Sequence, residues 1–466
     1  MSAKRSLSRR GFLKASAITV VGGVLAACAP AGTNATNTPQ PAVPTKVEVI
    51  NLTLLRPDRE IENKVDQANI EAFNKKMEAE GKPWRVNLQL GAATDNDYRA
   101  KMTVDAAAGN LADIAGVTST DVADYVAAGY LLDLKPYFDK WPDYAQFYDV
   151  LKPLVEYDGK IVGPPQGTTF TFFIRKDVLD GASISSDQPK TWDDFYAACD
   201  AIKTKANIIP VGLPAGTAWG GGSFGEGFRM VWLSFNGTII DPADDKWVVS
   251  SPNLLKAMQV YETLAKNEYL DVEGLMTPNP WEPIKYQKFP QGKLAIVTGG
   301  DWQWTFDWGP IGATPIEGLF EKVARWQFPQ EDGKPFTYVE GSPSRCVSAK
   351  TKAPDGCAAY LEFVNSTDRQ CTTMDLHIGG PSGRKDLADA CPKYKTIVGG
   401  KFYESSQLFG TGRTYQFNHV GAEKIADGIA KTMEDIITLK KSAQEAMDDF
   451  SKTMLQQLGP DLAKTA

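Results

Sequence analysis

Histidine is nearly absent from this chain: of its 466 residues only two are histidine, His377 and His419. Two imidazoles leave little material for a histidine-rich metal site or for catalysis that depends on a histidine base. A basic surface is missing as well, because 57 acidic side chains outnumber 50 basic ones and give a net charge of −7. That balance argues against a nucleic-acid partner. We therefore expect no metal, no cofactor and no nucleic acid.

The N-terminal apolar run is too short to stay in a membrane. Residues 15–27 form thirteen apolar or small residues, whereas a helix needs about 20 to cross a bilayer. Five basic residues and no acidic one lie within residues 1–27, which is typical of a secretory signal. The heptapeptide SRRGFLK at 8–14 looks like a twin-arginine export signature. Leu25-Ala26-Ala27-Cys28 looks like a lipobox, in which the Cys28 thiol is lipidated and becomes the new N-terminus.

Large aromatic and charged residues are missing from the next segment. Residues 29–45 consist mainly of Pro, Thr, Asn, Ala and Gly, a composition that cannot offset the entropy of ordering. We therefore predict a signal peptide at 1–27 and a lipidated cysteine with a flexible tether at 28–45. Removal of the signal would change the net charge to about −12. The expected product is an acidic lipoprotein outside the cytoplasm, anchored at the membrane.

The remaining five cysteines form no metal-binding pattern. None of the spacings between Cys346, Cys357, Cys371 and Cys391 matches a CxxC motif. Cys199 lies at helical spacing from Phe195 and is expected to be buried. An odd number allows at most two disulfides. The pairing stays open.

From residue 46 onward, short apolar runs alternate with amphipathic helices. Strands are expected at 46–55, 84–90, 113–117, 169–174 and 294–297, and helices at 61–77, 98–108, 191–204 and from 252. Thr191 and Asp194 resemble a capping box. The C-terminal region is expected to be entirely helical. Strand–helix repetition predicts an α/β fold with parallel pairing, and the length is too great for one core.

A glycine-rich segment at 219–228 matches two catalytic patterns. Residues 221–225 fit the G-x-S-x-G nucleophile elbow around Ser223, and Gly220, Gly222 and Gly225 fit the dinucleotide fingerprint. Neither has its expected context, because no strand leads directly into Ser223 and the glycines are far from the first strand–helix turn. We interpret the segment as a flexible loop that presents Trp219 and Phe224.

Tryptophan is abundant, and five of the eleven lie between residues 281 and 326. Asp301 and Trp302 directly follow a predicted strand, and ligands of open α/β sheets bind at that edge. An indole face covers the C–H face of a sugar, while a carboxylate accepts hydrogen bonds from its hydroxyls. Trp304, Trp308 and Trp326 are expected in the core. Carboxylate pairs for glycoside hydrolysis can be drawn from Glu226, Asp301 and Glu340, but no spacing singles one out.

Six segments in a particular order carry a family resemblance. They are Asp113-Ile114 followed by AGYLLDL at 128–134, GKIVGP at 159–164, RKDVL at 175–179, PKTWDDF at 189–195, FPQGKLA at 289–295 and GDW at 300–302. Over residues 46–466 the chain resembles the family 1 extracellular solute-binding proteins of ABC importers, the maltose-binding-protein-like group.

This resemblance implies a two-lobe, periplasmic-binding-protein-like (type II) α/β fold that closes on solute by a hinge. It implies lobe 1 at 46–165 with a return at 295–340, and lobe 2 at 166–294 with a return and C-terminal helices at 341–466. The implied function is carbohydrate binding without catalysis, as a monomer that partners the permease subunits of an importer.

The resemblance also places candidate ligand-binding residues in the cleft. They are Arg56, Thr118, Gln166, Thr168, Trp219, Phe224, Asp301, Trp302, Glu340, Arg413 and Tyr415. Thr168 stands where the maltose binder has a carboxylate, so a sugar other than maltodextrin is expected. Two alternatives stay open. One is a secreted hydrolase using Ser223 or a carboxylate pair. The other is a binder of an anionic solute such as a sugar phosphate, suggested by Arg56 and Arg413.

Overall fold

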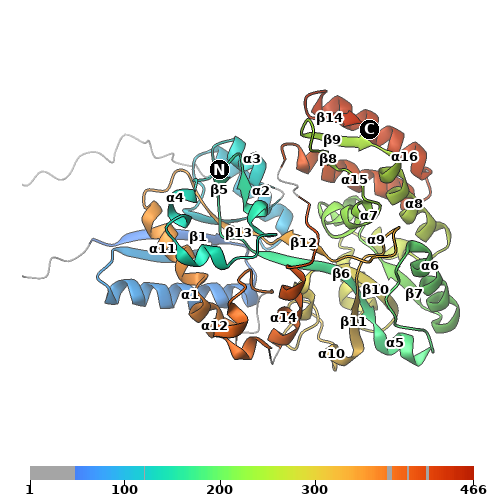
Figure 1. Cartoon of the computed structure of the whole chain (residues 1–466), viewed down its shortest axis with the longest axis horizontal. Helices are drawn as coiled ribbons and strands as arrows, with labels where there is room; N and C mark the ends of the chain where they lie inside the picture. The colour runs from blue at the N-terminus through green and yellow to red at the C-terminus, as the bar shows by residue number, and fades with distance from the viewer. Residues whose placement is uncertain (1–47, 120, 375–379, 396–397, 416–418) are drawn as a thin grey trace, which may run out of the picture. The chain divides into compact units, whose positions relative to one another are not determined.

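The computed structural model describes residues 48–119, 121–374, 380–395, 398–415 and 419–466 (Figure 1). The predicted signal peptide, Cys28 and the tether lie outside the described residues. Within the described part, no helix is both long enough and apolar enough to cross a membrane.

The first lobe is built on a four-stranded sheet in the order β13-β3-β1-β2. Its strands are β1 (Ile50–Arg56), β2 (Trp84–Leu90), β3 (Ile114–Val117) and β13 (Ser344–Val347). The first three are parallel, and β13 is antiparallel to β3. Alternating residues of β1 enter different cores: Leu54 packs with Phe73, and Leu55 packs with Met102. Both faces of this sheet are therefore buried, as parallel strands require.

Helices cover both faces of the first sheet. They are α1 (Glu60–Ala79), α2 (Asp95–Ala107), α3 (Val122–Ala127), α4 (Lys135–Phe138), α11 (Pro354–Val364) and α12 (Thr367–Thr373). The predicted strand at 84–90 and helix at 61–77 are confirmed by β2 and α1. A small hairpin of β4 (Glu156–Tyr157) and β5 (Lys160–Ile161) precedes the passage to the second lobe.

The second lobe is built on β6, which pairs with three other strands. The members of this sheet are β6 (Gly167–Arg175), β7 (Ile209–Gly212), β10 (Leu294–Gly299), β11 (Val323–Trp326) and β12 (Tyr338–Gly341). β10 is antiparallel to β6 and parallel to β7. All nine residues of β6 are buried, so this strand lies at the centre of the second core.

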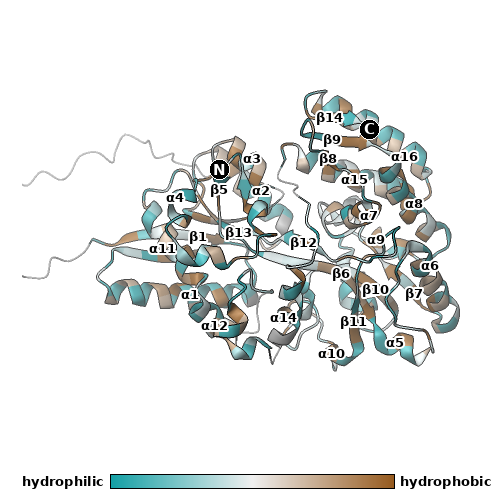
Figure 2. Cartoon of the chain, viewed as in Figure 1, coloured by the Kyte–Doolittle hydropathy of each residue, from teal (hydrophilic) through white to brown (hydrophobic). Residues whose placement is uncertain are grey.

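The second lobe carries most of the helices. They are α5 (Lys176–Gly181), α6 (Trp192–Ala201), α7 (Arg229–Ser234), α8 (Pro252–Lys266), α9 (Val272–Leu275), α10 (Leu319–Lys322), α13 (Leu387–Ala390), α14 (Val398–Leu408), α15 (Ala422–Ile437) and α16 (Ala443–Leu458). Figure 2 shows hydrophobic and hydrophilic residues on different parts of these ribbons. The capping box predicted at Thr191 and Asp194 is confirmed at the start of α6.

Two connections between the lobes run side by side. β12 pairs antiparallel with the start of β6, so that Glu340 is opposite Thr168. The Ser342 backbone N–H donates to the Gln166 carbonyl at 3.1 Å. In Figure 1, β12 and the start of β6 lie on the side of the second sheet that faces the first lobe. A change in the angle between the lobes would therefore act on these two segments.

The sheet topology corrects the expected assignment of segments to lobes. Residues 295–340 were expected in lobe 1, but β10, β11 and β12 all belong to the sheet of β6. Residues 341–466 were expected in lobe 2, but β13 pairs with β3, and α11 packs into the first core through Cys357 and Tyr360. A strand that is buried on both faces lacks a regular alternation of apolar and polar residues. Its own sequence pattern therefore does not show which sheet it joins.

The C-terminus is not entirely helical. After α16, β14 (Ala463–Thr465) pairs with β9 (Lys246–Ser250), which also pairs with β8 (Ile240–Asp241). A disulfide joins Cys371 and Cys391, linking the segment around α12 to α13. Cys199, Cys346 and Cys357 are buried free thiols, which confirms the burial expected for Cys199.

Candidate functional site

A cavity of about 1760 Å³ lies between the two lobes. Ligand pockets of ordinary size measure about 300–1,000 Å³, so this space can accept more than one sugar ring. First-lobe residues of its wall follow β1 and β3 or belong to α1, α2 and α3. Second-lobe residues come mainly from 219–226, 281–286 and 302–313, and the connecting segments contribute 165–168 and 340–343. Residues from 364–374, 380–383 and 422–427 also line the cavity.

The first-lobe wall is held by a network of ion pairs. Arg56 extends from the end of β1, and its Nε lies 2.8 Å from Asp66 Oδ2. Arg345 Nη2 lies 2.5 Å from the other oxygen of Asp66. Burial opposes ionisation of Asp66, but Arg345 and Arg56 outweigh it and lower the pKa of this carboxyl. The predicted residue Arg56 therefore lines the cavity as an ion-paired cation that shares Asp66 with Arg345.

A second ion pair follows β3. Thr118 lines the cavity, and its hydroxyl donates to Asp121 at 2.7 Å. Arg99 of α2 binds the same carboxylate through two guanidinium nitrogens. Thr118 is thus near the solute space, where sequence reasoning expected it, but its hydroxyl proton is engaged by Asp121.

The glycine-rich segment is ordered in the structure. Residues 217–219 form a 3₁₀ turn and residues 223–228 a π-helical turn, so the expected flexible loop is not what the structure shows. Gly220 has a φ of +60°, and a Cβ at this position would lie 3.3 Å from Asn96 of α2. Glycine is suited to this position because its backbone is left-handed and closely approached.

Trp219, Phe224 and Trp302 all line the cavity, as predicted. Trp219 is 7% exposed and Phe224 2% exposed, whereas Trp302 is half-buried. The ammonium of Lys285 lies 5.4 Å from the Trp219 ring centre and 5.7 Å from that of Trp302. The same ammonium lies 2.7 Å from Glu226 Oε2. Two indoles, a carboxylate and an ammonium therefore form one compact group.

The connecting segments contribute Gln166, Thr168 and Glu340 to the cavity wall. Glu340 is ion-paired with the fully buried Arg229 of α7. Burial raises the pKa of Glu340, and Arg229 opposes that rise. Arg229 also lies over the Tyr338 ring, 4.7 Å from its centre. This pair ties the connection at β12 to the helix that follows the glycine-rich segment.

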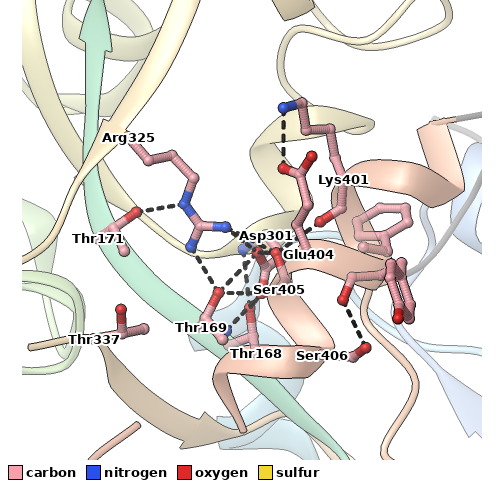
Figure 3. A network of polar contacts seen from close by, with 12 residues as sticks. Thr168, Thr169, Thr171, Asp301, Arg325, Thr337, Lys401, Glu404, Ser405 and Ser406 are labelled. Carbon is pink, nitrogen blue, oxygen red and sulfur yellow. Dashed lines mark hydrogen bonds and ion pairs between the residues drawn. The ribbon is translucent and has the colours of Figure 1, made fainter. Parts of the chain in front are cut away.

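Asp301 does not line the cavity, although sequence reasoning placed it there. Its carboxylate is fully buried and accepts hydrogen bonds from the Thr169 backbone N–H at 2.6 Å, from Ser405 at 2.5 Å and from Arg325 at 3.1 Å (Figure 3). Thr168 donates to it at 3.2 Å and accepts from its backbone N–H at 2.9 Å. Asp301 thus positions Thr168 and the neighbouring Trp302, while its own oxygens are taken.

Arg413 and Tyr415 are also absent from the cavity wall. The backbone of Arg413 bonds to Thr337 and Val339, and its guanidinium lies 5.2 Å from the Phe336 ring centre. The Tyr415 hydroxyl donates to the Ile240 carbonyl at 2.6 Å. Arg413 pairs with Tyr338 at the edge of β12 that does not pair with β6, and sequence spacing could not show that these two residues lie outside the cavity wall.

Several cavity residues were not predicted, among them Lys285, Tyr286 and Asp307. Burial raises the pKa of Asp307 to about 6, with Lys285 opposing and Glu226 adding to the rise. Tyr286 donates to Asp307 at 3.4 Å. In the sequence, Asp307 stands between Trp304 and Trp308, and both tryptophans are buried in the core as expected. That run of aromatics was the only sequence signal near it.

The hydrolase pattern at Ser223 is not matched by the geometry. Ser223 is fully buried, and its hydroxyl donates to the Gly216 carbonyl at 2.5 Å. A nucleophile needs an adjacent base and an exposed oxygen. The described residues contain no group of three or more histidine, cysteine or acidic side chains placed to hold a metal ion.

Comparison with known proteins identifies similar sequences and folds. A model of the family described as bacterial extracellular solute-binding protein matches residues 68–401. No curated protein matches the sequence.

Solved structures with the same fold include the following three. A solute-binding protein of an ABC transporter from Thermotoga lettingae, bound to α-D-tagatose, has 20% identity and a TM-score of 0.70, covering 88% of this chain and 100% of its own. The GacH receptor of Streptomyces glaucescens, solved without ligand and with acarbose, has 18% identity and a TM-score of 0.72, covering 89% and 99%. A chitin oligosaccharide binding protein has 21% identity and a TM-score of 0.68, covering 88% and 98%.

Proposed function

Because the chain belongs to the family of bacterial extracellular solute-binding proteins, we propose that it binds a carbohydrate in the interlobe cavity and delivers it to an ABC importer. The observation that carries this proposal is the group formed by Trp219, Trp302 and Glu226 on one wall of the cavity. Indole faces cover the C–H faces of sugar rings, and carboxylates accept hydrogen bonds from hydroxyls. The ligands named for the similar structures, tagatose, acarbose and chitin oligosaccharide, are of this class.

Closure about the paired connections would bring the two walls together on the solute. The second-lobe wall supplies the aromatic faces, and the first-lobe wall supplies Arg56, Thr118 and the groups bound to them. Gln166, Thr168 and Glu340 would contact solute from the connecting segments. In this proposed role the protein binds and releases its solute unchanged, and we expect no catalytic turnover.

The N-terminal segment supports a location at the outer face of the cell membrane. The twin-arginine signature would direct export of the folded chain, and lipid on Cys28 would hold it near the permease subunits. The chain is proposed to act there as a monomer. Replacing Cys28 by Ala should move the protein from the membrane fraction to the soluble one after export. Retention in the membrane fraction would contradict the lipid anchor.

A thermal-shift screen over monosaccharides and oligosaccharides tests the carbohydrate assignment. A solute present at a hundred times its dissociation constant should stabilise the folded state by ~2.7 kcal/mol. Amino acids and oligopeptides serve as the comparison set. Stabilisation by members of that set, together with no effect of any sugar, would overturn the carbohydrate assignment.

A further inference from the structure

Negative charge predominates on the wall of the interlobe cavity. Ten acidic side chains line it, against five basic ones. Each basic side chain is already ion-paired: Arg56 and Arg345 with Asp66, Arg59 with Glu62, Arg99 with Asp121 and Lys285 with Glu226. An anionic solute would therefore meet cations that are already ion-paired, on a wall where carboxylates outnumber cations two to one.

The excess of negative charge is greatest beside the two indoles. Three carboxylates, those of Glu226, Asp307 and Glu340, are close enough for Glu226 to influence the ionisation of both others. Lys285 pairs with Glu226, and Arg229 pairs with Glu340. No basic side chain of the described residues lies within ion-pair distance of Asp307. The group has one carboxylate more than it has cations.

Asp307 is buried without the partners that such burial normally requires. Its side chain belongs to a residue 4% exposed, and its Oδ2 has no hydrogen-bond partner among the described residues. Its Oδ1 accepts a long hydrogen bond from Tyr286, and the Gln303 side chain is the other neutral group that helps to lower its pKa. A buried carboxylate usually has two or more donors or a cation. Its raised pKa, about 6, is consistent with a missing positive charge.

The aromatic surface next to Asp307 is suited to a cation as well as to a sugar. Lys285 shows this directly, because its ammonium lies within 6 Å of both indole centres. A cation at this distance from an indole face is attracted by the negative face of the ring, and more strongly when water is excluded. A ligand ammonium could share these faces while it neutralises Asp307.

We propose that the cavity selects a carbohydrate bearing a protonated amine, with its ammonium beside Asp307 and Glu226 and its ring against Trp302. This inference rests on the proposed function and adds the chemical class of the sugar. A neutral sugar can use the indoles and hydroxyl acceptors, but only a cationic one balances the charge of this group. An N-acetylated sugar lacks the charge and should bind like the neutral parent.

Matched sugars separate charge from shape. Calorimetric affinities would be measured at pH 7 for glucose and glucosamine, galactose and galactosamine, and trimers of glucose, glucosamine and N-acetylglucosamine that share the β-1,4 linkage. In every set that binds, we expect the amine to bind at least tenfold more tightly than its neutral and acetylated counterparts. Equal or weaker binding of the amine would overturn the inference and leave the carbohydrate function standing. If no sugar of any kind binds, the proposed function fails as well.

Asp307→Asn tests the position of the ammonium. It keeps the shape of the side chain and removes its charge, so the amine preference should fall to within threefold. Asp193→Asn, an exposed position on α6, makes the same change in net charge outside the cavity and should retain the preference. A full preference in folded Asp307→Asn would place the ammonium elsewhere and overturn the assignment.

The wild-type protein offers a second readout that needs no variant. Lys285, Glu226 and Tyr286 are the charged or titratable groups that face Asp307. Because the pKa of Asp307 is about 6, its carboxyl gains charge as the pH rises from 5 to 7. Affinity for the amine should rise severalfold across that range, while affinity for the neutral sugar stays nearly constant. A flat profile for both ligands would contradict the proposal.

Discussion

Asp301 and Asp307 are six positions apart and both are buried, yet their surroundings are opposite. Asp301 has donors from three other segments of the fold, namely Thr169, Arg325 and Ser405. Asp307 has a long hydrogen bond from Tyr286, the neutral side chain of Gln303 nearby, and an Oδ2 without a hydrogen-bond partner among the described residues. The free-energy cost of burying a charged carboxylate is therefore largely offset by partners at Asp301, but not at Asp307.

The difference separates structural from binding chemistry. Asp301 joins β6, β11 and α14 through its hydrogen bonds, so its role is completed within the protein (Figure 3). Asp307 lies on the cavity wall, where a solute can supply what the protein does not. Incomplete satisfaction of a buried charge is common at functional sites. Substitutions on the structural side of this comparison should therefore act mainly on stability, and substitutions on the binding side mainly on affinity or on the pH dependence of stability.

The largest effect is expected for Asp301→Ala. Removing one partner of a buried charge pair costs about 3–5 kcal/mol because the other partner stays behind uncompensated. Arg325 is 17% exposed at its side chain and would lose that carboxylate. The free energy of unfolding should fall by about this amount in urea titrations. A loss below about 1 kcal/mol would mean that the network of Figure 3 contributes little.

Asp307→Asn should change stability in the opposite direction. The pKa of Asp307 rises from 3.8 to about 6 on folding, so the folded state holds its proton more tightly. Stability is then lost as pH rises from about 4 to about 6 and stays lower above that range. Asparagine removes this penalty, and the variant should gain about 2–3 kcal/mol at pH 7.5.

Thermal unfolding of wild type and variant between pH 4 and pH 8 checks the sign. The two curves should converge at the acidic end and separate through pH 6. A variant that is less stable than wild type at pH 7.5 would show that Asp307 is satisfied in solution. The contrast with Asp301 would then disappear.

Local structure was predictable from the sequence because its causes are local. The strand at 84–90, the capping box at Thr191 and the cap of α8 at Ser251 depend on residues within one or two turns. The partners of β10 and β13 were not predictable. The pairing of β10 with β6 and of β13 with β3 joins segments more than a hundred residues apart, and burial on both faces hides which sheet each strand enters.

The candidate site shows the same limit. Sequence order placed Trp219, Trp302 and Glu340 near the cavity, and the structure brings them to its wall. It could not show that Asp301 points inward while Asp307 lines the cavity, because both lie in one irregular stretch after β10. Direction within an irregular segment depends on tertiary contacts such as those from Ser405 and Tyr286.

Trp302→Ala should weaken binding more than it weakens the fold. The indole is half-buried on the cavity wall and packs edge-to-face against Phe170, with the ring centres 5.4 Å apart. Loss of its face should reduce sugar affinity at least tenfold, or ~1.4 kcal/mol. Trp304→Ala is the matched control, because Trp304 is 1% exposed in the core, and its removal should cost about 3–5 kcal/mol of stability. Unchanged affinity in Trp302→Ala would show that Trp302 has a structural role and does not bind the solute.

Arg413→Ala should have the smallest effect on affinity. Its guanidinium donates to Asn236 at 3.3 Å and lies over the Phe336 ring, and none of these three residues lines the cavity. We expect sugar affinity within about twofold of wild type, or below ~0.5 kcal/mol. Because its backbone bonds to Thr337 and Val339 are retained, β12 should keep its place. A tenfold loss of affinity in calorimetry would show that the segment around Arg413 reaches the solute when the lobes close. Arg413 would then be a binding residue although it lies outside the cavity wall in this structure.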